Sequence, residues 1–119
     1  MLKIAILVLA DVNETHGSRG RVRNALEVAK ECKESGDDVQ LIFDGGGTAS
    51  LAAILQSDHK MHGLYQAITA KVVGACAYCA QAFHIKDDLV NSAITLLYDY
   101  DQHPSLRSYL VNGYQILTF

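Results

Sequence analysis

Five short apolar segments along the chain predict the strands of a β-sheet. They are residues 4–10, 39–43, 72–73, 94–97 and 114–119. The first is an unbroken apolar run, which is typical of a strand buried on both faces. Residues 94–97 fit a fourth strand, although the pattern around them is equally compatible with a helix.

Helical periodicity fills the segments between these apolar runs. From Arg21 onward, apolar side chains recur at spacings of three and four and predict an amphipathic helix that stops at Gly36. These apolar positions are Val22, Ala25, Leu26, Ala29 and Cys32. Further helices are expected to begin at Thr48, near residue 64, near Cys79, near Lys86 and at Pro104.

The alternation of strands and helices predicts an α/β fold. We expect a three-layer α/β/α sandwich around a mostly parallel five-stranded sheet of flavodoxin-like type, with right-handed crossovers. The 119 residues suffice for one core, so residues 1–119 are expected to form a single domain. Half of the residues are hydrophobic and one is proline, which argues against disordered linkers.

The charge balance argues against nucleic acid or an anionic membrane as a partner. The formal net charge is -3 and the pI is near 5.9, whereas both partners normally require a basic face. Arg19, Arg21 and Arg23 form a positive cluster, but glutamates surround it, so it supports at most a small-anion site. The apolar run at residues 4–10 is too short to span a bilayer. We therefore expect a cytoplasmic protein.

Two cysteines directly follow the third apolar run, in the sequence GACAYCAQAF at residues 74–83. Cys76 and Cys79 therefore lie where a strand passes into a helix, which is where ligands and reactive groups collect in parallel α/β proteins. A helix start carries partial positive charge and favours thiolate over thiol. The third cysteine, Cys32, is expected to be a core residue. Cys76 should then react with an alkylating agent before Cys32.

The loops after the first two predicted strands would open onto the same edge of the sheet. His16 follows the first strand and is expected to stabilise a Cys76 thiolate or to shuttle a proton, with a solvated loop histidine as the alternative. The second loop consists of Asp44, Gly45, Gly46 and Gly47. Its backbone amides offer an anion site at a helix start, although it lacks the ending of a P-loop. We expect His16, Asp44 and Cys76 in one pocket.

Other uses of a Cys-x-x-Cys pair fit this sequence less well. A thioredoxin-like oxidoreductase would place a cis-proline opposite the pair, whereas the one proline, Pro104, is placed to begin a helix. A structural zinc site needs four ligands. The available ones are Cys76, Cys79, His84 and either His16 or His62. Their spacing matches no compact zinc module, so we expect neither a metal nor another cofactor.

The segment around the two cysteines and the end of the chain resemble the DsrE/DsrF-like sulfur-relay family. In that family a cysteine follows a strand and precedes a helix of small residues, as Cys76 does in residues 76–85, and a terminal strand like residues 114–119 ends in Phe. The order of elements is similar over nearly the whole chain. The resemblance implies a DsrE-like domain in which Cys76 carries sulfur, and hence a persulfide carrier or sulfurtransferase-like protein.

A persulfide carrier needs a thiolate that takes the outer sulfur of a donor persulfide and yields it to a second thiol. Cys79 would then resolve a Cys76 persulfide as an internal disulfide, with release of reduced sulfur. The resemblance also implies sulfur donor and acceptor proteins and a homo-oligomer. Aromatic material for its interface is offered by Tyr65, Tyr98, Tyr100 and Tyr109. The alternative function is a non-catalytic module that binds a small ligand or anion through the glycine loop and His16, with the cysteines as packing residues.

Overall fold

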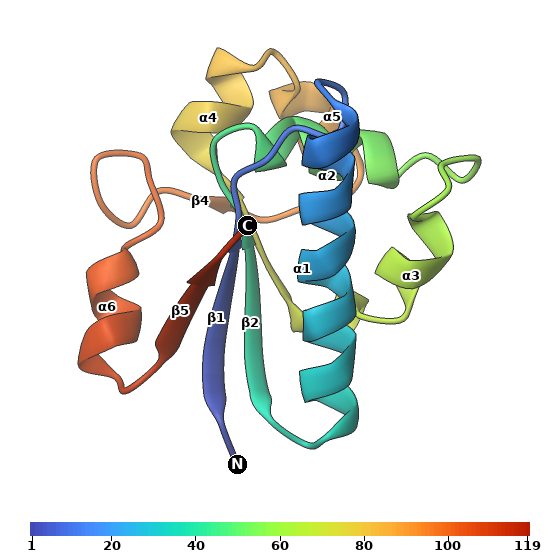
Figure 1. Cartoon of the computed structure of the whole chain (residues 1–119). Coiled ribbons are helices and arrows are strands. Elements are labelled where there is room, and N and C mark those ends of the chain that lie inside the picture. Colours follow the sequence, from blue (N-terminus) through green and yellow to red (C-terminus); the bar gives the residue numbers. More distant parts are fainter.

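The protein is built on a five-stranded sheet in which every strand runs parallel to its neighbours, as the computed structural model of residues 1–119 shows (Figure 1). The strand order is β4-β3-β2-β1-β5. The strands are β1 (Lys3–Val8), β2 (Asp38–Phe43), β3 (Val72–Cys76), β4 (Leu96–Leu97) and β5 (Gln115–Thr118). The predicted α/β fold with a parallel five-stranded sheet is confirmed.

Six α-helices and one short 3-10 helix connect the strands. They are α1 (His16–Glu34), α2 (Gly47–Ile54), α3 (His62–Gln66), η1 (Thr69–Lys71), α4 (Ala77–Ala82), α5 (Lys86–Asn91) and α6 (Leu106–Val111). α1 begins earlier than its apolar periodicity indicates because Thr15 caps it, with the Thr15 hydroxyl accepting from the Ser18 amide at 2.9 Å. None of the helices combines the length and the apolar character needed to cross a bilayer.

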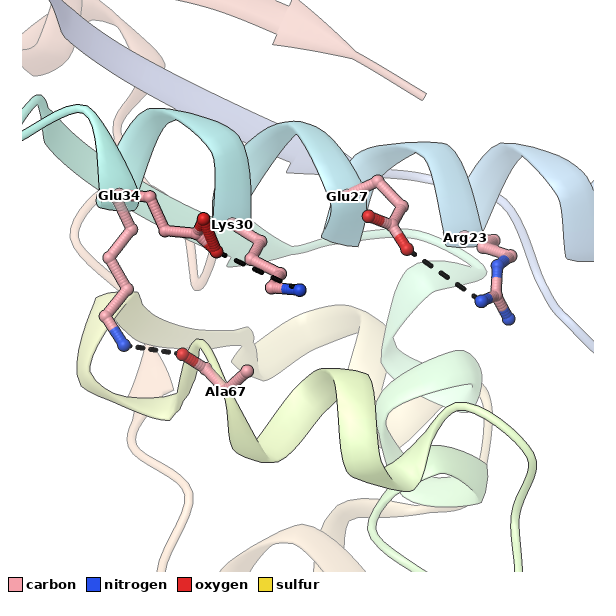
Figure 2. Close-up of polar contacts among 6 residues, drawn as sticks. Arg23, Glu27, Lys30, Glu34 and Ala67 are labelled. Carbon is pink, nitrogen blue, oxygen red and sulfur yellow. Dashed lines mark hydrogen bonds and ion pairs between the residues drawn. The ribbon is translucent and has the colours of Figure 1, made fainter.

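The exposed side of α1 is stabilised by charged side chains one turn apart. Arg23 pairs with Glu27 and Lys30 with Glu34, each at 3.8 Å (Figure 2). Such exposed i,i+4 pairs contribute roughly 0.3–0.5 kcal/mol each. The Lys33 ammonium also donates to the carbonyl of Ala67, which fastens α1 to the segment after α3.

The two faces of the sheet are covered unequally. One face carries alternate residues of β1 and β2, and together with α1 to α5 it forms a core cluster of 19 buried residues, to which α6 contributes none. The opposite face carries Ala5, Leu7, Ile42 and Cys76, which are buried outside that cluster. The connection from β4 to β5 runs against the direction of the others, so a right-handed crossover places α6 over this second face (Figure 1). Cys76 therefore points away from the main core.

β3 is longer than the predicted strand and has Cys76 as its last residue. The approach of β4 to β3 requires Gly74, because a Cβ at that position would lie 2.2 Å from the carbonyl oxygen of Thr95. Leu96 and Leu97 then pair with Ala75 and Cys76. This close contact brings the loop after β4 to the end of β3.

Of the four tyrosines expected to offer an interface, two do not present an exposed ring. Tyr65 is buried in the core and meets Phe43 edge-on, with ring centroids 6.5 Å apart. Tyr109 is half-buried and packs edge-on against Tyr114. Tyr98 and Tyr100 are each 69% exposed, so these two rings are accessible on the surface.

Candidate functional site

Three neighbouring strands, β2, β3 and β4, bring four polar side chains together where they end. Asp44 directly follows β2, Cys76 ends β3, Cys79 lies in α4, and His103 lies in the loop after β4. Their sulfur, nitrogen and oxygen atoms all lie within 4.8 Å of one another. We call these four residues the thiol cluster. Its position follows from the fold, because parallel strands end at the same edge of a sheet.

Each thiol of the cluster has a polar partner of its own. The Cys76 sulfur lies 3.1 Å from Nδ1 of His103, and the Cys79 thiol donates to Oδ1 of Asp44 at 3.3 Å. The Cys79 amide donates to the Cys76 sulfur at 3.4 Å. Both cysteines are free thiols. The cluster thus consists of a thiol–imidazole pair beside a thiol–carboxylate pair.

A tight turn presents His103 to the sulfur atoms. The backbones of Tyr100 and His103 hydrogen-bond to each other in both directions, at 2.9 and 2.8 Å. The two residues between them, Asp101 and Gln102, have positive φ angles of 47° and 66°. Such a backbone conformation costs roughly 1–2 kcal/mol for a residue other than glycine. The Tyr78 ring lies 4.9 Å from the His103 ring, and the Tyr78 amide donates to the Gln102 carbonyl. Tyr78 therefore contacts both the imidazole and the turn that carries it.

Burial controls the ionisation of both thiols. Cys76 is fully enclosed, and this burial raises its pKa to about 12 although the Cys79 amide favours the thiolate. Burial also raises the pKa of Cys79, which is half-buried. A helix start contributes at most about 2 kcal/mol in favour of the thiolate, which is too little to offset this burial. The structure thus reverses the direction expected for the Cys76 pKa.

The structure places the histidines predicted from the sequence outside the thiol cluster. His16 is the exposed first residue of α1, with Nδ1 3.5 Å from the Arg19 guanidinium. His84 is exposed after α4, and His62 lies 2.8 Å from the carbonyl oxygen of Ile54. Neither the predicted thiolate–His16 contact nor the alternative zinc ligands His84, His16 and His62 are found.

The imidazole that the cluster does contain, His103, escaped prediction. The sequence feature that could have indicated His103 is its position in the loop after residues 94–97. If those residues form a strand, that strand ends at the same edge of the sheet as Cys76. The apolar pattern around those residues fits a helix equally well, and that ambiguity hid the signal. Cys32 was expected to be a core residue, and the structure places it at the edge of the core. It is half-buried against the core, and burial followed by the nearby Asp37 raises its pKa.

The glycine loop is shaped by close packing against β1. A Cβ at Gly47 would lie 1.9 Å from the Val8 carbonyl oxygen, and one at Gly46 would lie 2.9 Å from the carbonyl oxygen of Leu9. The amides of Gly45 and Gly47 donate to the Asp44 side chain and carbonyl, each at 2.8 Å. Thr48 was expected to cap α2. Its hydroxyl instead donates to the carbonyl of Gly45, and no side chain caps this helix. Two backbone amides of the loop, which were expected to bind an external anion, therefore donate to Asp44 instead.

A pocket of about 530 Å³ lies further along the same edge, at the ends of β1 and β5. We call it the edge pocket. It is lined by Leu9, Ala10, Asp11, Glu14, Ser18, Arg21, Gly46, Phe83, Thr118 and Phe119. His16, Asp44 and Cys76 are not among these residues, so the predicted single pocket is divided into a cluster of thiols and a separate cavity.

Comparisons with known proteins extend the fold beyond this chain. No family model matches it. The chain is 27% identical over 116 residues to the uncharacterized protein MJ0733 of Methanocaldococcus jannaschii, across 98% of this chain and 94% of that protein. The solved structure of BT1422, a conserved protein of unknown function from Bacteroides thetaiotaomicron, superposes with a TM-score of 0.67 at 21% identity, over 97% of this chain and 94% of the other. The chain is thus homologous to MJ0733 over nearly its whole length and shares its fold with BT1422.

Proposed function

We propose that this protein is a cysteine-based persulfide carrier, a sulfurtransferase-like protein of the DsrE/DsrF type. The observation that carries the proposal is the gathering of two free thiols, an imidazole and a carboxylate within 4.8 Å at the carboxyl edge of a parallel sheet. Ionisable groups whose pKa values are shifted by burial and by each other are typical of functional sites. The resemblance of residues 76–85 to the sulfur-relay family supplies the chemistry.

The different burial of the two cysteines suggests an order of transfer. Cys79 is half-buried, whereas Cys76 is fully enclosed. In the proposed sequence the Cys79 thiolate attacks the outer sulfur of a donor persulfide, a new S–S bond forms at Cys79, and the donor leaves as a thiolate. Cys76 then takes the same sulfur from Cys79, whose thiolate leaves in turn. Each step exchanges one S–S bond for another and needs no external oxidant or reductant.

Two neighbouring groups are placed to accept the protons that these attacks release. The Cys79 thiol already donates to Asp44, and the Cys76 sulfur lies 3.1 Å from the His103 imidazole. A base beside a nucleophile raises the fraction that reacts as thiolate, which matters here because burial disfavours ionisation. His103 thus takes the role that the sequence assigned to His16.

The proposal includes the setting of the reaction. Three free cysteines fit the reducing conditions of the cytoplasm, where we place the protein. Sulfur donor and acceptor proteins are its proposed partners, and neither nucleic acid nor a membrane has a role. A homo-oligomer is part of the proposal, with the exposed rings of Tyr98 and Tyr100 as interface material.

The test is mass spectrometry of the reduced, chelator-treated protein after incubation with glutathione persulfide and trapping with an alkylating agent. We expect the mass of one sulfur atom on Cys79 or Cys76, located by peptide fragmentation. Cys79→Ser should abolish the uptake, whereas Cys32→Ser should retain it, since Cys32 lies in α1. Uptake on Cys32 alone, or on no cysteine, would contradict the proposal.

The edge pocket favours a second candidate function, a module that binds a small polar ligand. Charges of both signs line it, since Arg21 and Ser18 share the cavity with Asp11 and Glu14. The glycine loop contributes Gly46 to the wall. In this case the cysteines would be packing residues and the persulfide experiment would show no uptake.

A further inference from the structure

The spacing of the four ligating atoms in the thiol cluster matches that of a tetrahedral metal site. Zinc bonds of about 2.0–2.3 Å place neighbouring ligand atoms roughly 3.3–3.8 Å apart. Here Cys76 and His103 are separated by 3.1 Å, Cys79 and Asp44 by 3.3 Å, and no pair exceeds 4.8 Å. The atoms need to converge by no more than about 1 Å to complete a tetrahedron.

The donor set distinguishes between classes of cation. Magnesium and calcium prefer sites built from oxygen alone, whereas two sulfurs, one imidazole nitrogen and one carboxylate oxygen suit zinc and its borderline-soft neighbours. Two thiolates and the Asp44 carboxylate carry three negative charges, which a divalent cation reduces to one. We propose that Asp44, Cys76, Cys79 and His103 bind a single divalent cation of the zinc type.

The surroundings of the cluster already orient its ligands as metal sites require. Outer hydrogen bonds fix the direction of metal ligands and contribute about 10–100-fold in affinity. The Cys79 amide points at the Cys76 sulfur, and the Gly45 amide donates to Asp44. His103 is held by the turn that pairs it with Tyr100 and by the neighbouring Tyr78 ring. The ligands come from the ends of three adjacent strands, so the site would form only when β2, β3 and β4 lie side by side.

Cation binding and sulfur transfer would use the same two thiols, but neither function requires the other. A bound cation holds both sulfurs as ligands, so the loaded protein should accept no persulfide sulfur. The two proposals are tested on different forms of the protein. Uptake of sulfur is measured after treatment with a chelator, and cation binding is measured on the reduced protein without a sulfur donor.

The experiment is titration of the full-length, reduced, chelator-treated protein with Co²⁺ under anaerobic conditions, followed by Zn²⁺. Tetrahedral Co²⁺ with thiolate ligands has intense visible d–d bands and a near-ultraviolet charge-transfer band. We expect both sets of bands to saturate at one Co²⁺ per chain and to disappear when one equivalent of Zn²⁺ displaces the cobalt. Zinc should also raise the thermal midpoint, because it binds the folded state alone.

Matched variants assign the ligands. Cys79→Ser and His103→Ala should each weaken Co²⁺ binding by about 100-fold or more, beyond the effect of an outer hydrogen bond. Cys32→Ser and His84→Asn are the controls, each changing the same residue type outside the cluster; asparagine suits position 84 because its φ is 59°. Cys79 is preferred to the fully buried Cys76 because its substitution carries less risk of misfolding.

The outcomes are decisive in both directions. Saturation at one equivalent with loss in Cys79→Ser and His103→Ala, and retention in both controls, supports the site. Absence of thiolate–cobalt bands in the folded wild-type protein overturns it. Bands that persist in Cys79→Ser, or that vanish equally in Cys32→Ser, also overturn it, because the cobalt would then lie elsewhere. Circular dichroism of every variant confirms that a loss of binding is not a loss of fold.

Discussion

The two ends of the sheet treat their ionisable groups in opposite ways. At the amino end, the Asp38 carboxylate accepts hydrogen bonds from the Tyr114 hydroxyl at 2.5 Å and from the Gln40 amide at 3.1 Å. The Lys3 ammonium lies 4.6 Å from the centre of the Tyr114 ring. These contacts join the starts of β1, β2 and β5, and the Tyr114 hydrogen bond, above all, lowers the pKa of Asp38. Every partner there stabilises the charged carboxylate.

At the carboxyl end, burial opposes the ionisation of both thiols of the thiol cluster. Burial, followed by the neighbouring thiol and carboxylate, opposes the thiolate form of Cys76 and raises its pKa. Burial is also the largest cause that raises the pKa of Cys79. The Cys76 thiol acts in the opposite direction, and the Asp44 carboxylate that Cys79 contacts adds to the increase. The comparison teaches that the same strands support a stabilising network at one end and an arrangement at the other that folding alone would not favour.

The largest loss of stability should come from a substitution at Gly47, near the carboxyl end of the sheet. A Cβ there would lie 1.9 Å from the backbone oxygen of Val8, so Gly47→Ala must displace α2 or β1. We expect a loss of about 3 kcal/mol or more in the free energy of unfolding, measured by urea denaturation.

Gly20→Ala is the matched control for that substitution. Gly20 lies inside α1, and nothing approaches within 4 Å of the position of its added Cβ. Gly20→Ala should stabilise the protein by roughly 0.5–1 kcal/mol, because alanine suits a helix interior better than glycine. Equal effects of the two changes would show that the close approach at Gly47 is unimportant.

An intermediate effect is expected for thiol labelling, which compares the reactivity of the two cysteines in the thiol cluster. In the folded protein near neutral pH, a limiting alkylating agent should modify Cys79 at least about tenfold faster than the enclosed Cys76. The half-buried Cys32 should also precede Cys76, which replaces the order expected from the sequence. Since a thiol with a raised pKa ionises only at high pH, the Cys76 rate should keep increasing toward pH 12.

Peptide mass spectrometry after timed quenching measures these rates. Labelling in denaturant, where the three cysteines should react alike, is the control for the reagent. If Cys76 reacts first and its rate levels off near neutral pH, the thiol is exposed and ionised, and the assignment of Cys79 as the point of entry is wrong.

The smallest effect concerns the amino end and its pH dependence. The folded-state pKa of Asp38 lies below that of an ordinary aspartate, about 3.9. Its stabilising contribution is therefore present above that ordinary value and is lost as pH falls through the folded-state pKa. Asp38→Asn should therefore lose less stability than the wild type between about pH 4 and pH 2.

Urea denaturation across that pH range checks the difference. Asp58→Asn, which removes an exposed carboxylate from the turn after α2, is the control and should follow the wild-type curve. A wild-type curve that matches Asp38→Asn would mean that the amino-end network contributes nothing.

Local patterns in the sequence predict most of the elements because each pattern reports how its own segment is covered. The apolar run of β1, the periodicity of α1 and the start of α5 at Lys86 all appear where expected. β4 is reduced to Leu96–Leu97, and its apolar pattern is too short to separate strand from helix. The position of Cys76 at a strand end was predictable for the same local reason.

The sequence by itself determined the α/β alternation and the placement of a cysteine pair at a strand–helix junction, since both depend on neighbouring residues. Only the tertiary structure decided which imidazole joins the thiols. The order β4-β3-β2-β1-β5 sets the loop after β4 beside β3, and so brings in His103 and leaves out His16. It also decided that Cys76 is enclosed and that its pKa is raised. Both outcomes depend on contacts between segments far apart in the chain, which no local pattern encodes.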